Sequence, residues 1–150
     1  MKDSKSSFVT REHAKVDRIA CAWLIKRFIN PNAEILYVHR DEVLRIAENK
    51  GALPFDIPGV ELGHHADLCS FDAFLKKYDL TDPALARIAE IVRGADTDNR
   101  ALTPESAGLY AIASGFHAQW GSRYADDYAL LEVEFPLYDS LYEFCKISAS

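Results

Sequence analysis

Hydrophobic positions recur at helical spacing along most of this chain, and the first clear case is the stretch of residues 16–29. Its apolar stripe consists of Val16, Ile19, Ala20, Trp23, Leu24 and Phe28. This is the spacing of an amphipathic helix. Asn30 and Pro31 end the pattern, because proline and the residue before it disfavour further helical turns.

The same pattern predicts further helices and only a few strands. Helical spacing recurs at residues 41–51, 70–78, 82–96, 103–116, 124–135 and 137–147. Short apolar runs at residues 34–38 and within 52–62 predict strands, and the prolines of the second run favour a sheet edge. Residues 1–8 are predicted to be a loose N-terminal arm, followed by one domain over residues 9–150. The predicted fold class is α+β, a helix-rich single domain with a small sheet of two or three short strands.

Composition and charge narrow the class of protein. The chain has 150 residues, 49% of them apolar, and a formal net charge of −6. An acidic chain is a poor candidate for direct nucleic-acid binding, which depends on a basic surface. No apolar run approaches the roughly 18 residues of a membrane span, so no membrane partner is expected. Three widely spaced cysteines without a CxxC motif and an N-terminus without a signal sequence indicate a cytoplasmic protein.

Charged side chains interrupt the apolar stripe of the first predicted helix. Asp17 lies at the edge of the stripe, and Arg27 lies on it. Because a charge removed from water is costly unless paired, both are predicted to be shielded and to form structural ion pairs. Arg11, Lys15 and Arg18 surround the amino end of the same helix, where free N–H groups favour an anion. They are candidate anion-binding residues.

The stretch VELGHHADLCSFD, residues 60–72, is the richest in groups that bind metals or move protons. Candidate metal ligands are His64, Cys69, Asp72 and Asp96, with His65, Asp67 and Asp98 as secondary candidates. Two antiparallel helices over 70–78 and 82–96 would bring Cys69 and Asp96 to the same end. Imidazole with carboxylates favours Zn, Fe or Mn, and a thiolate favours Zn. A capped polar loop without a metal accounts for the same residues.

Three blocks of the sequence resemble a known family. They are VDRIACAWLIKRF, HHADLCSFD and IVRGADT, within a likeness that runs from Phe8 to Cys145. The chain is similar to the C-terminal domain of the chromate-resistance ChrB family. This resemblance implies a part in chromate or oxyanion stress and defines no reaction. Ala22, Asn30 and His13 depart from the family pattern, and His64 matches its histidine.

Three functions are compatible with these observations. The first is a small stress-associated protein that binds a metal ion or a small oxyanion. The second is a metal-dependent enzyme, either a hydrolase or a redox protein that reduces chromate. The third is an interaction module that binds a protein partner through its acidic C-terminal helices. The sequence leaves the catalytic residues, if it is an enzyme, unassigned.

Overall fold

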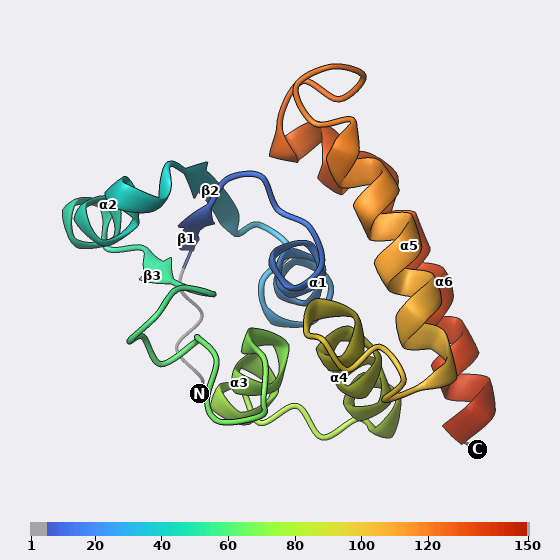
Figure 1. The fold of residues 1–150 in the computed structure, drawn as a ribbon. Coiled ribbons are helices and arrows are strands. Elements are labelled where there is room, and N and C mark those ends of the chain that lie inside the picture. The colour runs from blue at the N-terminus through green and yellow to red at the C-terminus, as the bar shows by residue number, and fades with distance from the viewer. Residues whose placement is uncertain (1–5, 150) are drawn as a thin grey trace.

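A small parallel sheet and a set of helices make up the structure, a computed structural model that describes residues 6–149. The described part contains three strands and six α-helices (Figure 1). This confirms the predicted α+β class with a small sheet. In chain order the elements are β1 (Ser7–Arg11), α1 (Asp17–Leu24), the π-helical segment η1 (Ile25–Ile29), β2 (Glu34–Val38), the 3₁₀ turn η2 (Arg40–Glu42), α2 (Val43–Lys50), β3 (Leu53–Pro54), α3 (Ser70–Lys77), α4 (Pro83–Asp96), α5 (Pro104–Ala118) and α6 (Asp127–Ala149).

The sheet has the strand order β2-β1-β3, with both pairs parallel. Side chains alternate across β1, as the pleat of a strand requires. Phe8 packs into the main core with Ile19 of α1, whereas Val9 packs into a second cluster with Val43 of α2. Helices α1 and α2 therefore cover opposite faces of the sheet.

The carboxyl ends of all three parallel strands meet at one edge of the sheet. The segments that leave this edge begin at Glu12 after β1, at His39 after β2 and at Phe55 after β3. The connection from β1 to β2 contains α1 and the connection from β2 to β3 contains α2, so the two connections leave on opposite faces. In sheets of this kind, ligands bind outside the carboxyl ends of the strands, where the connections diverge.

The remaining helices pack against α1 and each other. Helix α4 contacts α1, α3, α5 and α6, and the last two run along the outer side of the molecule, where they overlap in the view of Figure 1. Asp82 accepts a hydrogen bond from the N–H of Ala84 at the start of α4, where Pro83 is the first residue. Among the described residues, no helix has both the length and the apolar character needed to cross a bilayer.

Three expectations about the elements need correction. Strand β1 begins at Ser7, so the predicted arm extends too far; residues 1–5 of that arm lie outside the described residues. The two helices predicted over 124–147 are one helix, α6, which continues through Pro136. Arg27 is paired with Asp139 at 2.9 Å but 43% of its side chain is exposed, so the predicted shielding is wrong. Its π-helical turn directs it to the protein surface rather than into the stripe.

Candidate metal centre

Three carboxylates surround one histidine beside the carboxyl edge of the sheet. The Nε2 atom of His64 lies 3.0 Å from Asp56 Oδ1, 3.6 Å from Asp17 Oδ2 and 3.5 Å from Asp96 Oδ2. The structure thus brings His64 and Asp96 together, as the sequence predicted. Asp17 was predicted only as a structural ion pair, and Asp56 was not predicted at all.

Each of these side chains is delivered by a different part of the fold. Asp17 is the first residue of α1, Asp96 is the last residue of α4, and Asp56 follows β3. His64 comes from the loop before α3. Gly63 precedes it, and a Cβ there would come within 2.6 Å of the carbonyl oxygen of Ile57. Only glycine lets this loop approach so closely.

Asp17 also ties α1 to the start of α3. Its carboxylate accepts hydrogen bonds from the backbone N–H groups of Ser70 (2.8 Å) and Phe71 (3.2 Å), and from the thiol of Cys21. It is buried, with 1% of its surface exposed. The N–H groups of a helix's first turn have no partner within the helix, so Asp17 satisfies two of them for α3.

Asp56 connects the histidine to the basic residues of the site. Its Oδ1 atom accepts a hydrogen bond from the hydroxyl of Ser70 at 3.1 Å, and its Oδ2 atom lies 3.7 Å from Nε of Arg18. Its carbonyl oxygen accepts a hydrogen bond from Arg11. Asp56 has a φ of 53°, in the left-handed region, where an L-residue is strained. Strain of this kind concentrates at functional sites.

The pKa values of Asp17, His64 and Asp96 are all raised in this group of residues, which carries an excess of negative charge. Burial, together with the charges of Asp56 and Asp96, raises the pKa of Asp17 well above its usual value. Burial and the charge of Asp56 raise the pKa of Asp96 to about 6. The hydrogen bond to Asp56 and the surrounding carboxylates raise the pKa of His64 to about 9. Protonated His64 therefore partly compensates the carboxylates in this structure.

The same arrangement suits a divalent cation. Ligand atoms of Asp17, His64 and Asp96 all lie within 4.8 Å of one another, and this is the one such group of three or more among the described residues. One imidazole and two carboxylates are ligands of Zn, Mn and Fe(II). A cation would relieve the repulsion that raises the pKa values of the two aspartates and would replace the proton on Nε2 of His64.

Cys69 and Asp72 do not belong to this group, and their predicted convergence with His64 and Asp96 is wrong. Asp72 accepts hydrogen bonds from the N–H and the thiol of Cys69, and it forms an ion pair with Arg93 at 3.2 Å. Burial raises the pKa of the Cys69 thiol, which makes it a poor thiolate ligand. A pocket of about 550 Å³ lies beside Cys69 and Asp72. The carboxylate of Asp72 is already engaged by the N–H and the thiol of Cys69 and by Arg93.

The secondary candidates lie apart from the centre as well. His65 is exposed, and its Nε2 atom is bonded to the carbonyl oxygen of Glu61 at 2.7 Å. Asp67 and Asp98 are exposed residues of the loops before α3 and after α4. None of the three is in the group of candidate metal ligands.

The predicted basic patch is divided by the fold. Arg11 and Arg18 lie together beside Asp56, and burial together with the charge of Arg18 lowers the pKa of Arg11. Lys15 instead lies over the ring of Tyr110, with its Nζ atom 4.6 Å from the ring centre. The position of Lys15 in an anion site with the two arginines is therefore not supported, and it lines neither of the two pockets beside Arg11.

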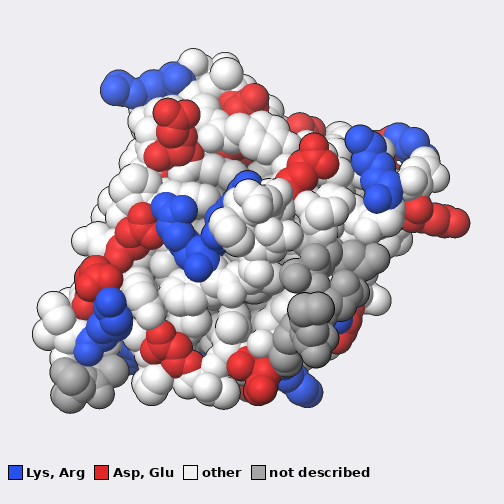
Figure 2. All heavy atoms as spheres, turned by 180° about the vertical axis from the view of Figure 1, so that it is seen from behind, with Lys and Arg blue, Asp and Glu red and all other residues white. Residues whose placement is uncertain are grey.

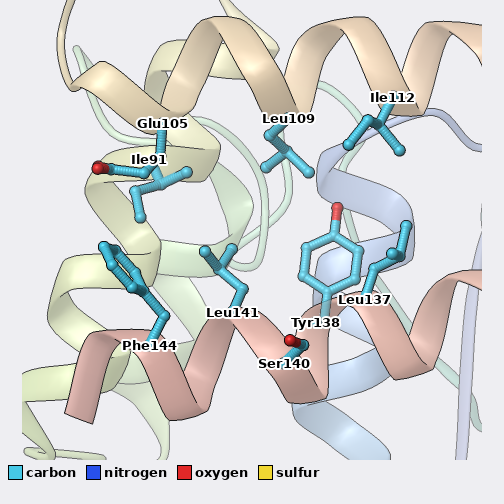
Figure 3. Close-up of a pocket in the computed structure, with 9 residues that line it drawn as sticks. All are labelled: Ile91, Glu105, Leu109, Ile112, Leu137, Tyr138, Ser140, Leu141 and Phe144. Atoms are coloured by element: carbon cyan, nitrogen blue, oxygen red, sulfur yellow. The ribbon is translucent and has the colours of Figure 1, made fainter. Parts of the chain in front are cut away.

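A pocket between α5 and α6 has a different character. It measures about 380 Å³, and Leu109, Ile112, Leu141 and Phe144 project into it (Figure 3). Its acid, Glu105, forms an ion pair with Arg87, so the pocket offers mainly apolar contact. On the face opposite to the view of Figure 1, basic and acidic side chains alternate without an extended basic area (Figure 2).

Comparison with known proteins identifies the family of this chain. The chain matches the family described as ChrB, C-terminal domain, over residues 8–145. It is 35% identical over 136 residues to Protein ChrB of Cupriavidus metallidurans, a match that covers 90% of this chain and 39% of that relative. The chain thus spans well under half the length of this relative. No solved structure matches it. The match covers nearly all of the described residues, and the chain belongs to the ChrB C-terminal domain family.

Proposed function

We propose that this domain binds one divalent transition-metal ion through Asp17, His64 and Asp96, next to the carboxylate of Asp56. The observation that carries the proposal is the position of His64 Nε2, within 3.6 Å of carboxylate oxygens from three different aspartates. Like charges held so close are costly without a cation, and two of these aspartates have raised pKa values.

The choice of metal follows from the ligands. Without Cys69 the set has no thiolate, so the preference for Zn over Mn or Fe(II) that a thiolate would give is lost. Three protein ligands leave coordination positions for water or a small ligand, which is the pattern of reactive rather than structural sites. When bound, such an ion can polarise an oxygen atom or lower the pKa of a bound water.

The family relation indicates the cellular process in which the proposed metal centre takes part. The resemblance to chromate-resistance proteins supports a part for this domain in chromate or oxyanion stress, with the metal centre as its chemical element. A metal-dependent enzyme is the second candidate function, favoured by the pocket of about 390 Å³ that Asp56 and His64 line next to the proposed ligands. An interaction module without chemistry would leave this buried charge unexplained.

Elemental analysis of the purified protein tests the proposal. We expect close to one equivalent of Zn, Mn or Fe per chain in the wild type and a loss of that metal in Asp96→Asn. The matched control is Asp98→Asn, because Asp98 lies two residues further on and is exposed. Equal metal content in all three proteins, or none after incubation with each metal, would refute the proposal.

A further inference from the structure

Two pockets meet at Arg11 along the carboxyl edge of the sheet. One, of about 390 Å³, lies towards β3 and is lined by Arg11, Asp56, His64 and the Ile57–Gly59 turn. The other, of about 300 Å³, lies towards β2 and is lined by Arg11, Glu12, His13, Arg18, His39 and Arg40. The first borders the proposed metal ligands, and the second collects the basic side chains.

The second pocket has unused capacity to donate hydrogen bonds. The Nε atom of Arg11 is buried and has no hydrogen-bond partner among the described residues. Arg40 is exposed and forms no ion pair with a described residue. Arg18 is engaged only loosely, with Nη2 3.4 Å from the carbonyl oxygen of His13 and Nε 3.7 Å from Asp56. Three guanidinium groups thus line a pocket in which Glu12 is the one carboxylate side chain.

Guanidinium groups arranged in this way favour an oxyanion. Arginine presents several N–H donors in a plane and binds carboxylate and phosphate oxygens in pairs. Burying like charges side by side is unfavourable unless a counter-charge is present. An anion with several oxygens accepts hydrogen bonds from more than one guanidinium and also balances their charge, which a neutral or cationic ligand does not.

We infer that this pocket binds a tetrahedral dianionic group, of the phosphate or sulfate type, carried by the ligand of the adjoining metal centre. That the anion belongs to a ligand of the metal centre rests on the proposed function. Asp56 links the two sites, because its Oδ2 atom faces Arg18 and its Oδ1 atom faces His64. A tetrahedral group on the arginines directs one oxygen towards the metal ligands. The Ile57–Gly59 turn offers an apolar wall for an organic part of the ligand.

Calorimetric titration of the full chain with sulfate and with phenyl phosphate tests this inference. We expect both to bind, with affinity that falls as salt is raised, and Arg40→Ala to weaken both by about tenfold, the loss of one charge-assisted hydrogen bond. Arg45→Ala is the matched control, because Arg45 is an exposed arginine of α2 that pairs with Glu42 instead. Tighter binding of phenyl phosphate indicates an ester as the ligand, and equal binding indicates a free oxyanion.

The result that overturns the inference is distinct from failure of the metal site. If neither anion binds the wild type, or if Arg40→Ala binds them as the wild type does, the anion pocket is wrong. A parallel titration with Mn²⁺ reads the metal centre alone, and Arg40→Ala is expected to leave it unchanged. Anion binding without metal binding would refute the proposed function and limit the inference to the arginine pocket.

Discussion

A single carboxylate, Asp72, and a group of three, Asp17, Asp56 and Asp96, lie near the start of α3, and they differ in how their charge is balanced. Asp72 faces one guanidinium, that of Arg93, and also accepts the N–H of Cys69. Asp17, Asp56 and Asp96 share one imidazole, with Arg18 at the margin. The charge of Asp72 is balanced by residues of the chain itself. The group of three aspartates carries more negative charge than the neighbouring basic side chains neutralise. This excess of charge distinguishes a candidate metal centre from a structural ion pair.

The comparison also shows that burial alone does not identify a site. Asp17 is the most buried of these carboxylates and has a structural task, because it satisfies the first N–H groups of α3. A carboxylate has about four lone-pair positions, so it can serve the helix and still offer an oxygen to a cation. The two roles can be separated by substitution.

The largest expected effect comes from Asp17→Ala. This change leaves the N–H groups of Ser70 and Phe71 buried without partners, at about 1–3 kcal/mol each. Relief of repulsion from Asp56 and Asp96 offsets part of the loss, so we expect a net loss of about 3 kcal/mol in the free energy of unfolding. Urea denaturation measures it. A loss below about 1 kcal/mol would show that α3 does not depend on this contact.

Asp96→Asn is expected to separate stability from metal binding. It removes a like charge, so the metal-free variant should be as stable as the wild type or more stable. The wild type should gain about 2.7 kcal/mol at a metal concentration of 100 times Kd, and the variant should gain almost none. Thermal unfolding with and without Mn²⁺ or Zn²⁺ checks both parts. Equal stabilisation of the two proteins would remove Asp96 from the ligands.

The metal-free protein should lose stability as the pH rises from about 4 to 9. The folded-state pKa of Asp96, about 6, lies above its usual value of 3.8, and that of His64, about 9, lies above 6.5. Both groups bind protons more tightly in the folded state, so their contribution is fully present at low pH and is lost through these two windows. For Asp96 the difference between a pKa of 3.8 and one of about 6 corresponds to a loss of about 3 kcal/mol.

Metal should reverse this trend, because the ion competes with the proton on His64 and its affinity rises with pH. Urea denaturation of the metal-free and metal-loaded wild type at pH 5, 7 and 9 makes the comparison. Parallel curves for the two forms would contradict a shared site for the proton and the metal.

Asp72→Ala should have a smaller effect, confined to stability. The substitution removes the carboxylate at the start of α3 and leaves Arg93 unpaired, which we expect to cost about 1–2 kcal/mol. Metal-dependent stabilisation should stay at its wild-type value. A loss of metal binding in this variant would restore Cys69 and Asp72 to the site.

The smallest expected effect is that of Arg27→Ala. Its pair with Asp139 is exposed, and pairs of this kind contribute about 0.2–1 kcal/mol. The hydrogen bond from the Trp23 indole to Asp139 remains. Chemical denaturation should therefore show a loss of less than about 1 kcal/mol, well below that of Asp17→Ala on the same helix. A loss comparable to that of Asp17→Ala would mean that Arg27 supports the core.

The sequence predicted the parts of this molecule that depend on local pattern. Helical periodicity identified α1, α3 and α4, and the antiparallel arrangement of α3 and α4 predicted that Asp96 lies at the end where α3 begins, close to the loop that carries His64. The sequence could not show that Asp17 is a better candidate ligand than Asp72, because the ion-pair partner of Asp72 is Arg93 on another helix. It missed Asp56, whose position after a two-residue strand gives almost no local signal, although a carboxylate at the end of a parallel strand is a general sign of a ligand site.

The most direct test of the central claim is a crystal structure of the protein grown with Mn²⁺ or Zn²⁺, with the ion located by its anomalous scattering. We predict one strong peak between Asp17, His64 and Asp96, at about 2.0–2.2 Å from their ligand atoms. A peak beside Cys69 and Asp72, or no peak near His64 at a saturating metal concentration, would contradict the account.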